Sequence, residues 1–115
     1  MRTSKSVIVV GGGIGGLTAA LALQRDGRDV VVLERRPTSE EAGAGISLWP
    51  NAMRILRELG VGGPLEAAAI SDGRATIRTS RGRRLSVTDM DEIGRRYAAP
   101  LGVVHRSRLL AESVP

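Results

Sequence analysis

The sequence predicts an α/β fold, and three features in the first third of the chain indicate it. Residues 6–10 contain the β-branched, continuously apolar run Val7–Val10 and end at a glycine-rich stretch, residues 11–16. An alanine- and leucine-rich segment typical of helices follows over residues 17–25. A second apolar run covers residues 30–33. Two strands joined by a helix form a βαβ unit, for which we expect a right-handed crossover.

The first elements are expected to be deeply buried. Unbroken apolar runs such as residues 6–10 and 30–33 are typical of parallel strands that are covered on both faces. Apolar residues surround most of the helix over 17–25, so we expect it between two layers. Gly27 can adopt the left-handed conformation that ends a helix.

The middle of the chain predicts a loop, an extended piece and a helix. Residues 35–44 are polar and show no helical or strand periodicity, which indicates a surface loop. Residues 45–48 are expected to be extended. Pro50 suits the first turn of a helix. Its apolar face would comprise Ala52, Ile55, Leu56 and Leu59, and Gly60 would end it.

The remaining segments predict short elements. Residues 64–69 read as a helical turn, and 101–104 and 106–113 as a strand and a helix. The alternation of side chains with a period of two over residues 74–79 predicts a strand with one solvent-exposed face. A turn at 80–83 would join it to a partner strand at 84–88, and the polar residues 89–100 would form an excursion.

Composition excludes several functional classes. The 115 residues suit a single domain. Because the chain has no cysteine, disulfides and thiolate metal sites are excluded, and one histidine leaves little imidazole chemistry. No apolar run reaches the ~20 residues of a membrane helix, and the first one is too short for a signal peptide. We therefore expect a cytoplasmic location and no membrane partner.

The net charge of +5 does not by itself indicate nucleic acid. Sixteen of the seventeen basic residues are arginine, which resembles a codon bias, and they look scattered along the sequence. Only Trp49 and Tyr97 could stack on bases. We expect no nucleic-acid partner.

The glycine-rich turn predicts a dinucleotide site in a partial Rossmann-like domain. Gly11 would allow the tight turn after the strand, and Gly13 would let the backbone approach a diphosphate. Gly16 would allow close packing of helix on strand. The helix N-terminus then presents unpaired N–H groups to the anion. Glycine is frequent in this chain, so the turn could also be a simple strand–helix connection.

Glu34 adds a second indication of a dinucleotide. It ends the second strand, 18 residues after Gly16, where a carboxylate accepts hydrogen bonds from an adenosine ribose. Its charge would repel a 2′-phosphate, which favours FAD or NAD over NADP. Without the glycine-rich turn, a glutamate that follows a strand would usually be interpreted as a solvent-exposed charge with no ligand.

The chain resembles FAD-dependent aromatic-ring hydroxylases, the flavoprotein monooxygenases of the p-hydroxybenzoate and salicylate hydroxylase type. The resemblance rests on V-I-V-V-G-G-G-I-G-G-L-T-A-A-L-A-L, V-V-V-L-E-R, G-A-G-I-S-L-W-P-N-A-M-R-I-L-R-E-L-G and V-H-R-S-R-L-L. It covers most of the chain and is weakest over residues 71–100. It implies that residues 1–115 are the N-terminal part of an FAD/NAD(P)-binding domain.

The resemblance also implies roles for individual residues. The FAD diphosphate would be held by Gly11, Gly13, Ile14, Gly15 and Gly16. Glu34 would bind the adenosine ribose and Arg35 would lie along the adenine. Gly45 and Ile46 would approach the ribityl and flavin region, and Arg106 would reach the ribityl or diphosphate. His105 has no implied role and is expected to be packed or at the surface, and Trp49 is expected in the core.

The chain also departs from this family. One branch has an arginine where this chain has Gly43, so that flavin contact is absent. Two later FAD motifs and the substrate domain are absent, so we expect a fragment, a truncated product or a split protein that is inactive alone. NAD(P)H would be the electron donor of the complete enzyme, acting on a small aromatic substrate, and no catalytic or metal-binding residue is assigned.

Two further expectations concern partners. A free-standing dinucleotide-binding module without redox activity is the alternative function. In either case the incomplete sheet would have an open edge, which tends to pair with another strand. We therefore expect self-association or a complementing second chain.

Overall fold

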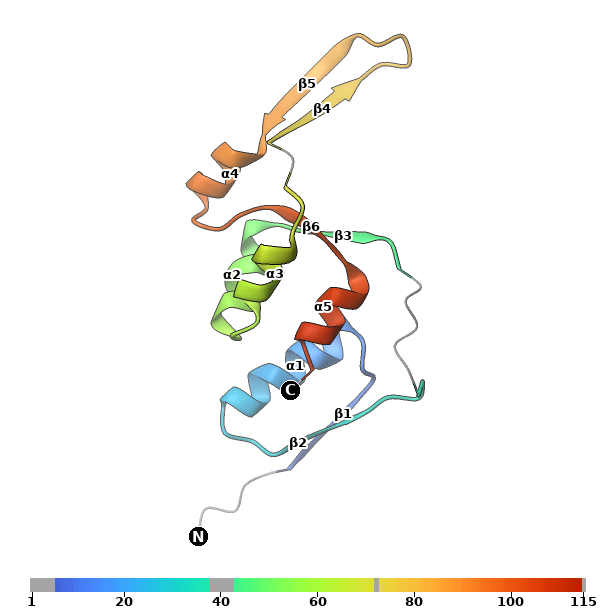
Figure 1. The fold of residues 1–115 in the computed structure, drawn as a ribbon. Coiled ribbons are helices and arrows are strands. Elements are labelled where there is room, and N and C mark those ends of the chain that lie inside the picture. Colours follow the sequence, from blue (N-terminus) through green and yellow to red (C-terminus); the bar gives the residue numbers. More distant parts are fainter. Residues whose placement is uncertain (1–5, 38–42, 72, 115) are drawn as a thin grey trace.

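The computed structural model describes residues 6–37, 43–71 and 73–114 (Figure 1). Its strands are β1 (Val7–Val10), β2 (Val30–Leu33), β3 (Gly45–Leu48), β4 (Arg74–Arg78), β5 (Arg84–Asp89) and β6 (Gly102–His105). Its helices are α1 (Ile14–Arg25), α2 (Pro50–Glu58), α3 (Gly62–Ala68), α4 (Met90–Arg96) and α5 (Arg106–Glu112). The predicted α/β class is confirmed. In the described ranges no helix has the length and apolar character needed to cross a membrane.

The molecule is elongated, measuring 65 × 31 × 20 Å. Its radius of gyration is 17.6 Å, whereas a compact domain of this length has about 13 Å. The strands form three separate two-stranded sheets, β1-β2, β3-β6 and β4-β5. The sheet of a Rossmann-like domain is therefore incomplete, as the sequence predicted.

The predicted βαβ unit lies at the end of the molecule opposite the β4-β5 pair (Figure 1). β1 and β2 are parallel, with Val7 opposite Val30 and Val10 opposite Leu33. α1 packs against this pair through Leu17, Ala20 and Leu21, which are its buried residues. Gly27 has a φ of +77° directly after the helix, as expected for its end.

The expectation that both strands are buried on both faces is wrong. Ile8 and Val31 are opposite each other and are 64% and 51% exposed, and Val10 and Leu33 on the same face are exposed as well. α1 covers only the other face of the pair. Parallel strands with continuous apolar runs are normally packed against other elements on both faces of the sheet. Here the described residues cover only one face of β1-β2.

Two expectations about the first helix need correction. α1 begins at Ile14, three residues before the predicted start, so Gly15 and Gly16 belong to its first turn. The helix also buries one face only, because the second layer that would enclose it is not formed by the described residues.

The main core lies in the centre of the molecule, between β3-β6 and three helices. β3 and β6 are antiparallel, with Gly45 opposite His105. The buried residues of this core are Leu48, Met53, Leu56, Leu65, Ala99, Val104 and Leu109. The predicted face of α2 is partly wrong, because Ile55 is exposed and Met53 is buried in its place. Trp49, expected in the core, is 51% exposed.

The hairpin β4-β5 projects from the core at the end opposite the βαβ unit (Figure 1). Its predicted turn and pairing are confirmed. The expectation of a single solvent-exposed face is wrong, because Ile77 is exposed as well. Of the other residues on its face, Ala75 and Thr79 are only half-buried. Among the residues that the structure describes, no helix packs along the hairpin, because α4 lies at its base (Figure 1).

The polar segment 89–100 is not an irregular excursion, because it contains α4. The Asp89 carboxylate accepts a hydrogen bond from Glu92 N–H at 2.9 Å, which caps this helix. Asp followed by Glu three residues later is a capping-box pattern, so the sequence did contain a signal for α4.

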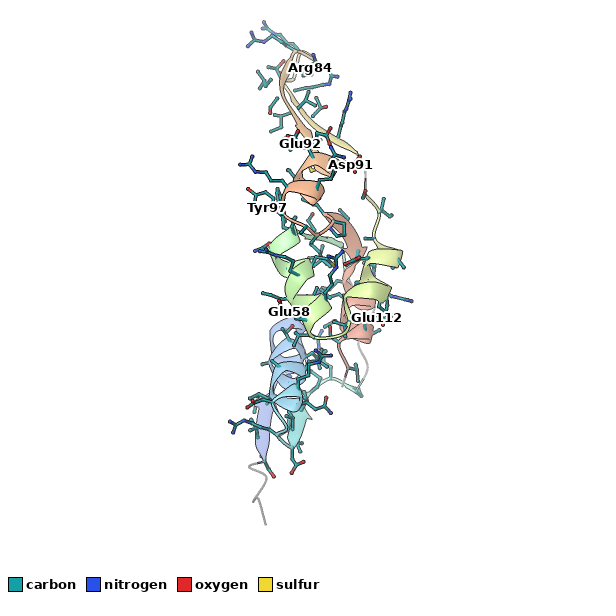
Figure 2. All side chains as sticks on the ribbon, turned by 90° about the vertical axis from the view of Figure 1, so that its left-hand side faces the viewer. Glu58, Arg84, Asp91, Glu92, Tyr97 and Glu112 are labelled. Carbon is teal, nitrogen blue, oxygen red and sulfur yellow. The ribbon has the colours of Figure 1, made fainter. Side chains whose placement is uncertain are left out.

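The arginines are also less scattered than the sequence suggested. Residues 74–88 contain five arginines and no acidic residue, whereas the rest of the chain has twelve basic and twelve acidic residues. The net charge of +5 therefore equals that of residues 74–88, which form the hairpin without its last residue, Asp89. Figure 2 shows one of these side chains, Arg84, at the far end of the molecule.

Candidate dinucleotide-binding site

The turn between β1 and α1 is open to an approaching ligand. Gly11 has a φ of +108°, a conformation that favours glycine, and its N–H donates to Leu33 O at 2.7 Å. A Cβ placed on Gly13 or Gly15 would have no atom within 4 Å. No side chain therefore blocks the turn at these two positions.

Gly16 has a different role, which the sequence predicted. A Cβ on this residue would overlap Gly11 O, and the Val9 side chain is also close. Only glycine allows α1 to pass this near to the end of β1. The position fixes the angle at which the helix leaves the turn.

The N-terminus of α1 is well suited to an anion. Gly13 occupies the N-cap position and no side chain caps the helix. The first turn, which begins at Ile14, contains no acidic residue. The N–H groups of a first turn have no partner within the helix and hold a partial positive charge, so they can bind a diphosphate.

Glu34 faces this turn. One carboxylate oxygen, Oε2, accepts a hydrogen bond from Gly12 N–H at 2.7 Å, and Oε1 accepts one from Arg36 N–H at 2.8 Å. These hydrogen bonds, that from Arg36 first, hold the pKa of the Glu34 carboxyl below its usual value. Glu34 is thus ionised at neutral pH, and its side chain is 36% exposed.

Two residues near Glu34 were missed by the sequence reasoning. A Cβ on Gly12 would lie 3.1 Å from the Glu34 side chain, so this glycine gives the carboxylate room to reach the turn. Arg36 places its Nε 3.8 Å from Glu34 Oε1. Three consecutive glycines were the available signal for Gly12, whereas nothing in the sequence distinguished Arg36 from Arg35, which is exposed.

The other predicted site residues form a second group at one end of the β3-β6 pair. Gly45 and Ile46 lie on β3, opposite His105 and Val104. A Cβ on Gly45 would lie 2.7 Å from a Val103 methyl group, so a side chain at this position would require the Val103 side chain to shift. Arg106 begins α5, and its Cβ would be 3.2 Å from one placed on Gly43.

α5 connects the two groups of residues. Its start at Arg106 adjoins the β3 group, and Leu110 and Ala111 line a cavity of about 410 Å³ together with Gly12 and Glu34. Four residues of helix rise by about 6 Å, so the two groups are about one helical turn apart along α5. His105 is exposed and caps α5, since its Nδ1 accepts from Ser107 N–H at 3.4 Å.

A parallel βαβ unit with an open glycine turn, an uncapped helix and an acid at the end of the second strand defines a dinucleotide-binding domain of Rossmann-like type. The model of the FAD binding domain family matches residues 4–114. The chain belongs to this family, and the family resemblance inferred from the sequence is confirmed.

Individual relatives agree with this assignment. The chain is 38% identical over 109 residues to aurachin C monooxygenase/isomerase of Stigmatella aurantiaca, covering 95% of this chain and 28% of the relative. It is 40% identical over 114 residues to a 3-amino-4-hydroxybenzoate 2-monooxygenase of Streptomyces platensis, covering 95% and 29%. The chain thus matches little more than a quarter of each, at the N-terminal part.

A solved structure shows the same arrangement of elements. The HpxO protein of Klebsiella pneumoniae, complexed with FAD and uric acid, superposes with a TM-score of 0.86 at 30% sequence identity. The match covers 98% of this chain and 28% of that one. The backbone described above therefore occurs in a protein that holds FAD.

Proposed function

We propose that this chain is the N-terminal, FAD-binding portion of an NAD(P)H-dependent flavoprotein monooxygenase that hydroxylates an aromatic or similar small organic substrate. Its family and the monooxygenase names of its relatives support the proposal. The structural observation that supports it most is the open turn at Gly13 and Gly15, where no side chain would obstruct a diphosphate.

The diphosphate would lie at the glycine turn. The residues that would hold it are Gly11, Gly13, Ile14, Gly15 and Gly16. The turn residues would allow the backbone to approach, and the first N–H groups of α1 would supply the positive end of the helix dipole. The absence of acids in the first turn of α1 supports this placement.

The adenosine part would lie toward β2. Glu34 would accept hydrogen bonds from the ribose hydroxyls, since its hydrogen bond to Gly12 keeps the carboxylate at the turn. Arg35 would lie along the adenine. A 2′-phosphate would be repelled by this carboxylate, so the adenosine of FAD suits the site better than that of NADP.

The opposite end of FAD would lie toward β3 and α5. Gly45 and Ile46 would approach the ribityl and flavin region, and Arg106 would provide a positive charge to the ribityl or diphosphate. The separation of about one helical turn between Arg106 and the cavity at Gly12 supports a single extended ligand. When bound, FAD supplies redox chemistry: it accepts electrons from NAD(P)H and activates oxygen.

The chain is proposed to be inactive alone, because the substrate domain would lie outside residues 1–115. It would act with a complementing second chain or as a self-associated form, and in the cytoplasm. The exposed apolar face of β1-β2 supports a partner, because a parallel sheet is normally covered on both faces.

Calorimetry with FAD, ADP and NAD tests the binding part of this proposal. FAD should bind more tightly than ADP, because it would contact both groups of residues. Similar affinity for all three ligands would instead favour a free-standing dinucleotide-binding module without redox activity. A mixture with the remaining part of a relative such as the Stigmatella enzyme should be yellow and oxidise NAD(P)H, whereas a flavin-free complex would contradict the proposal.

A further inference from the structure

Both aromatic residues of the chain line one groove, away from the dinucleotide site. The groove lies between the start of α2 and α4 and has a volume of about 480 Å³. Its principal lining residues are Trp49, Arg54, Glu92, Ile93, Arg96 and Tyr97. We call it the Trp49–Tyr97 groove. The predicted FAD contacts lie instead in the turn after β1, in the first turn of α1, directly after β2, on β3 and at the start of α5.

The aromatic rings are available to a ligand. Trp49 is 51% exposed and Tyr97 is 49% exposed. In Figure 2 Tyr97 lies at the end of α4, well below the hairpin tip. Large rings that remain half-exposed in a concave site offer stacking surfaces, and small-molecule sites are concavities of this size with mostly apolar walls and a few polar groups.

The guanidinium groups are also available. Arg96 places its guanidinium carbon 5.9 Å from the centre of the Tyr97 ring, which is a cation–π arrangement. In the described part of the chain, the side chains of Arg54, Arg96 and Glu92 form no ion pair or side-chain hydrogen bond. The groove thus combines two positive charges and one negative charge with two aromatic faces.

We propose that the Trp49–Tyr97 groove binds a planar aromatic anion. The rings would stack on Trp49 and Tyr97, and the anionic group would pair with Arg54 and Arg96, since guanidinium binds carboxylate and phosphate oxygens well. Glu92 would weaken the binding of an anion by repulsion and accept a hydrogen bond from a ring substituent. This site is independent of FAD binding and of the proposed function.

The ligand could come from two sources with the same chemistry, a free aromatic acid or a nucleotide. NMR of the ¹⁵N-labelled full chain distinguishes them, because Trp49 is the single tryptophan and gives one indole N–H signal. The probes are 2-naphthoate for an aromatic acid, adenosine monophosphate for a nucleotide, 2-naphthol for an uncharged ring and cyclohexanecarboxylate for an anion without a ring. Tighter binding of 2-naphthoate would identify the ligand as an aromatic acid, and tighter binding of adenosine monophosphate would identify it as a nucleotide.

We expect a saturable shift of the Trp49 signal with 2-naphthoate or the nucleotide, and binding at least about five-fold weaker for 2-naphthol and cyclohexanecarboxylate. Arg54→Gln and Arg96→Gln should each weaken anion binding about two- to five-fold, and Glu92→Gln should strengthen it by a similar factor, as expected for single exposed charges. Arg84→Gln is the matched control, because Arg84 lies at the distant hairpin tip (Figure 2).

Three results would overturn the proposal. The first is a Trp49 signal that does not shift, or does not saturate, with either anion at millimolar concentration. The second is equal binding of the ring-free or uncharged probe. The third is an equal effect of Arg84→Gln and the two groove variants, which would indicate non-specific attraction by the basic chain. The substituted side chains are exposed, and the backbone NMR spectrum reports whether each variant remains folded.

Discussion

The Glu34 carboxylate accepts a hydrogen bond from Gly12 N–H at 2.7 Å. This contact joins the end of β2 to the glycine turn after β1, across 22 residues of sequence. The acid that would bind the ribose therefore also holds the turn that would bind the diphosphate. One side chain couples two parts of the proposed site.

The first prediction concerns this coupling. Glu34→Gln keeps a carbonyl oxygen for Gly12 N–H but loses the charge and one acceptor, so it should weaken FAD binding about ten-fold. Fluorescence titration of FAD measures the effect. Glu58→Gln is the control, because Glu58 is an exposed acid on α2 (Figure 2) and outside the site. Equal affinity of wild type and Glu34→Gln would remove Glu34 from the cofactor site.

The second prediction separates packing from binding at two neighbouring glycines. Gly16→Ala should destabilise the fold by about 3 kcal/mol, because its Cβ would overlap Gly11 O. Gly15→Ala should stabilise the fold by up to about 1 kcal/mol, because alanine is the better residue in the first turn of α1 and finds open space. Thermal unfolding measures both changes.

At Gly15, the effect of an alanine substitution on FAD affinity should be opposite to its effect on stability. A methyl group at Gly15 would occupy the space proposed for the diphosphate, so Gly15→Ala should weaken FAD binding although the protein is more stable. Calorimetry with ADP would check this on the adenosine diphosphate part of FAD, without the ribityl and flavin part. A Gly15→Ala variant with wild-type affinity for ADP would place the diphosphate elsewhere.

The third prediction is a pH dependence due to Glu34. Its pKa is lowered in the folded protein, so its contribution to stability is complete above the unfolded value of about 4.3 and is lost as pH falls through the lower folded value. The difference in Tm between wild type and Glu34→Gln should be constant from neutral pH to about pH 5 and shrink below it. A difference that grows on acidification would contradict the hydrogen-bonded, ionised state.

Much of this fold follows from local sequence signals. The parallel βαβ unit, the hairpin and the helix ends at Gly27 and Gly60 were predicted, because apolar runs and glycines at positive φ depend on few neighbours. The helix α4 could have been predicted from Asp89 and Glu92, whose spacing indicates a cap. It was missed because the segment has few apolar residues.

Other features depend on contacts that a sequence does not reveal. Met53 and Ile55 are both apolar residues of α2, and only the packing of the helix on its neighbours selects Met53 for the core. The exposure of Ile8 and Val31 depends on whether another element packs on their face of the β1-β2 sheet, and the sequence of the two strands does not reveal this. Likewise, the hydrogen bond that the Glu34 carboxylate accepts from Gly12 N–H requires two loops to meet that are 22 residues apart in the sequence.

The fourth prediction concerns Arg57, which connects three segments of the central region. Its guanidinium pairs with Glu66 of α3 and donates to Ala98 O at 2.9 Å. The Glu66 carboxylate raises the pKa of Arg57, so the pair is charged over the ordinary pH range. Arg57→Gln should lower Tm by several degrees, whereas Arg81→Gln on the hairpin should leave it unchanged. Equal Tm values for both variants would show that Arg57 does not stabilise the core.

The fifth prediction concerns the open face of β1-β2. Ile8 and Val31 are opposite each other on this face, and covering them would remove apolar surface from water. We expect the chain to self-associate with rising concentration, and the double variant Ile8→Thr/Val31→Thr, which keeps β-branched residues in both strands, to do so less. Light scattering measures the mass, with Ile77→Thr on the exposed hairpin as the control. A wild-type chain that stays monomeric at high concentration would exclude this face as a self-association surface, and a stronger effect of Ile77→Thr would move that surface to the hairpin.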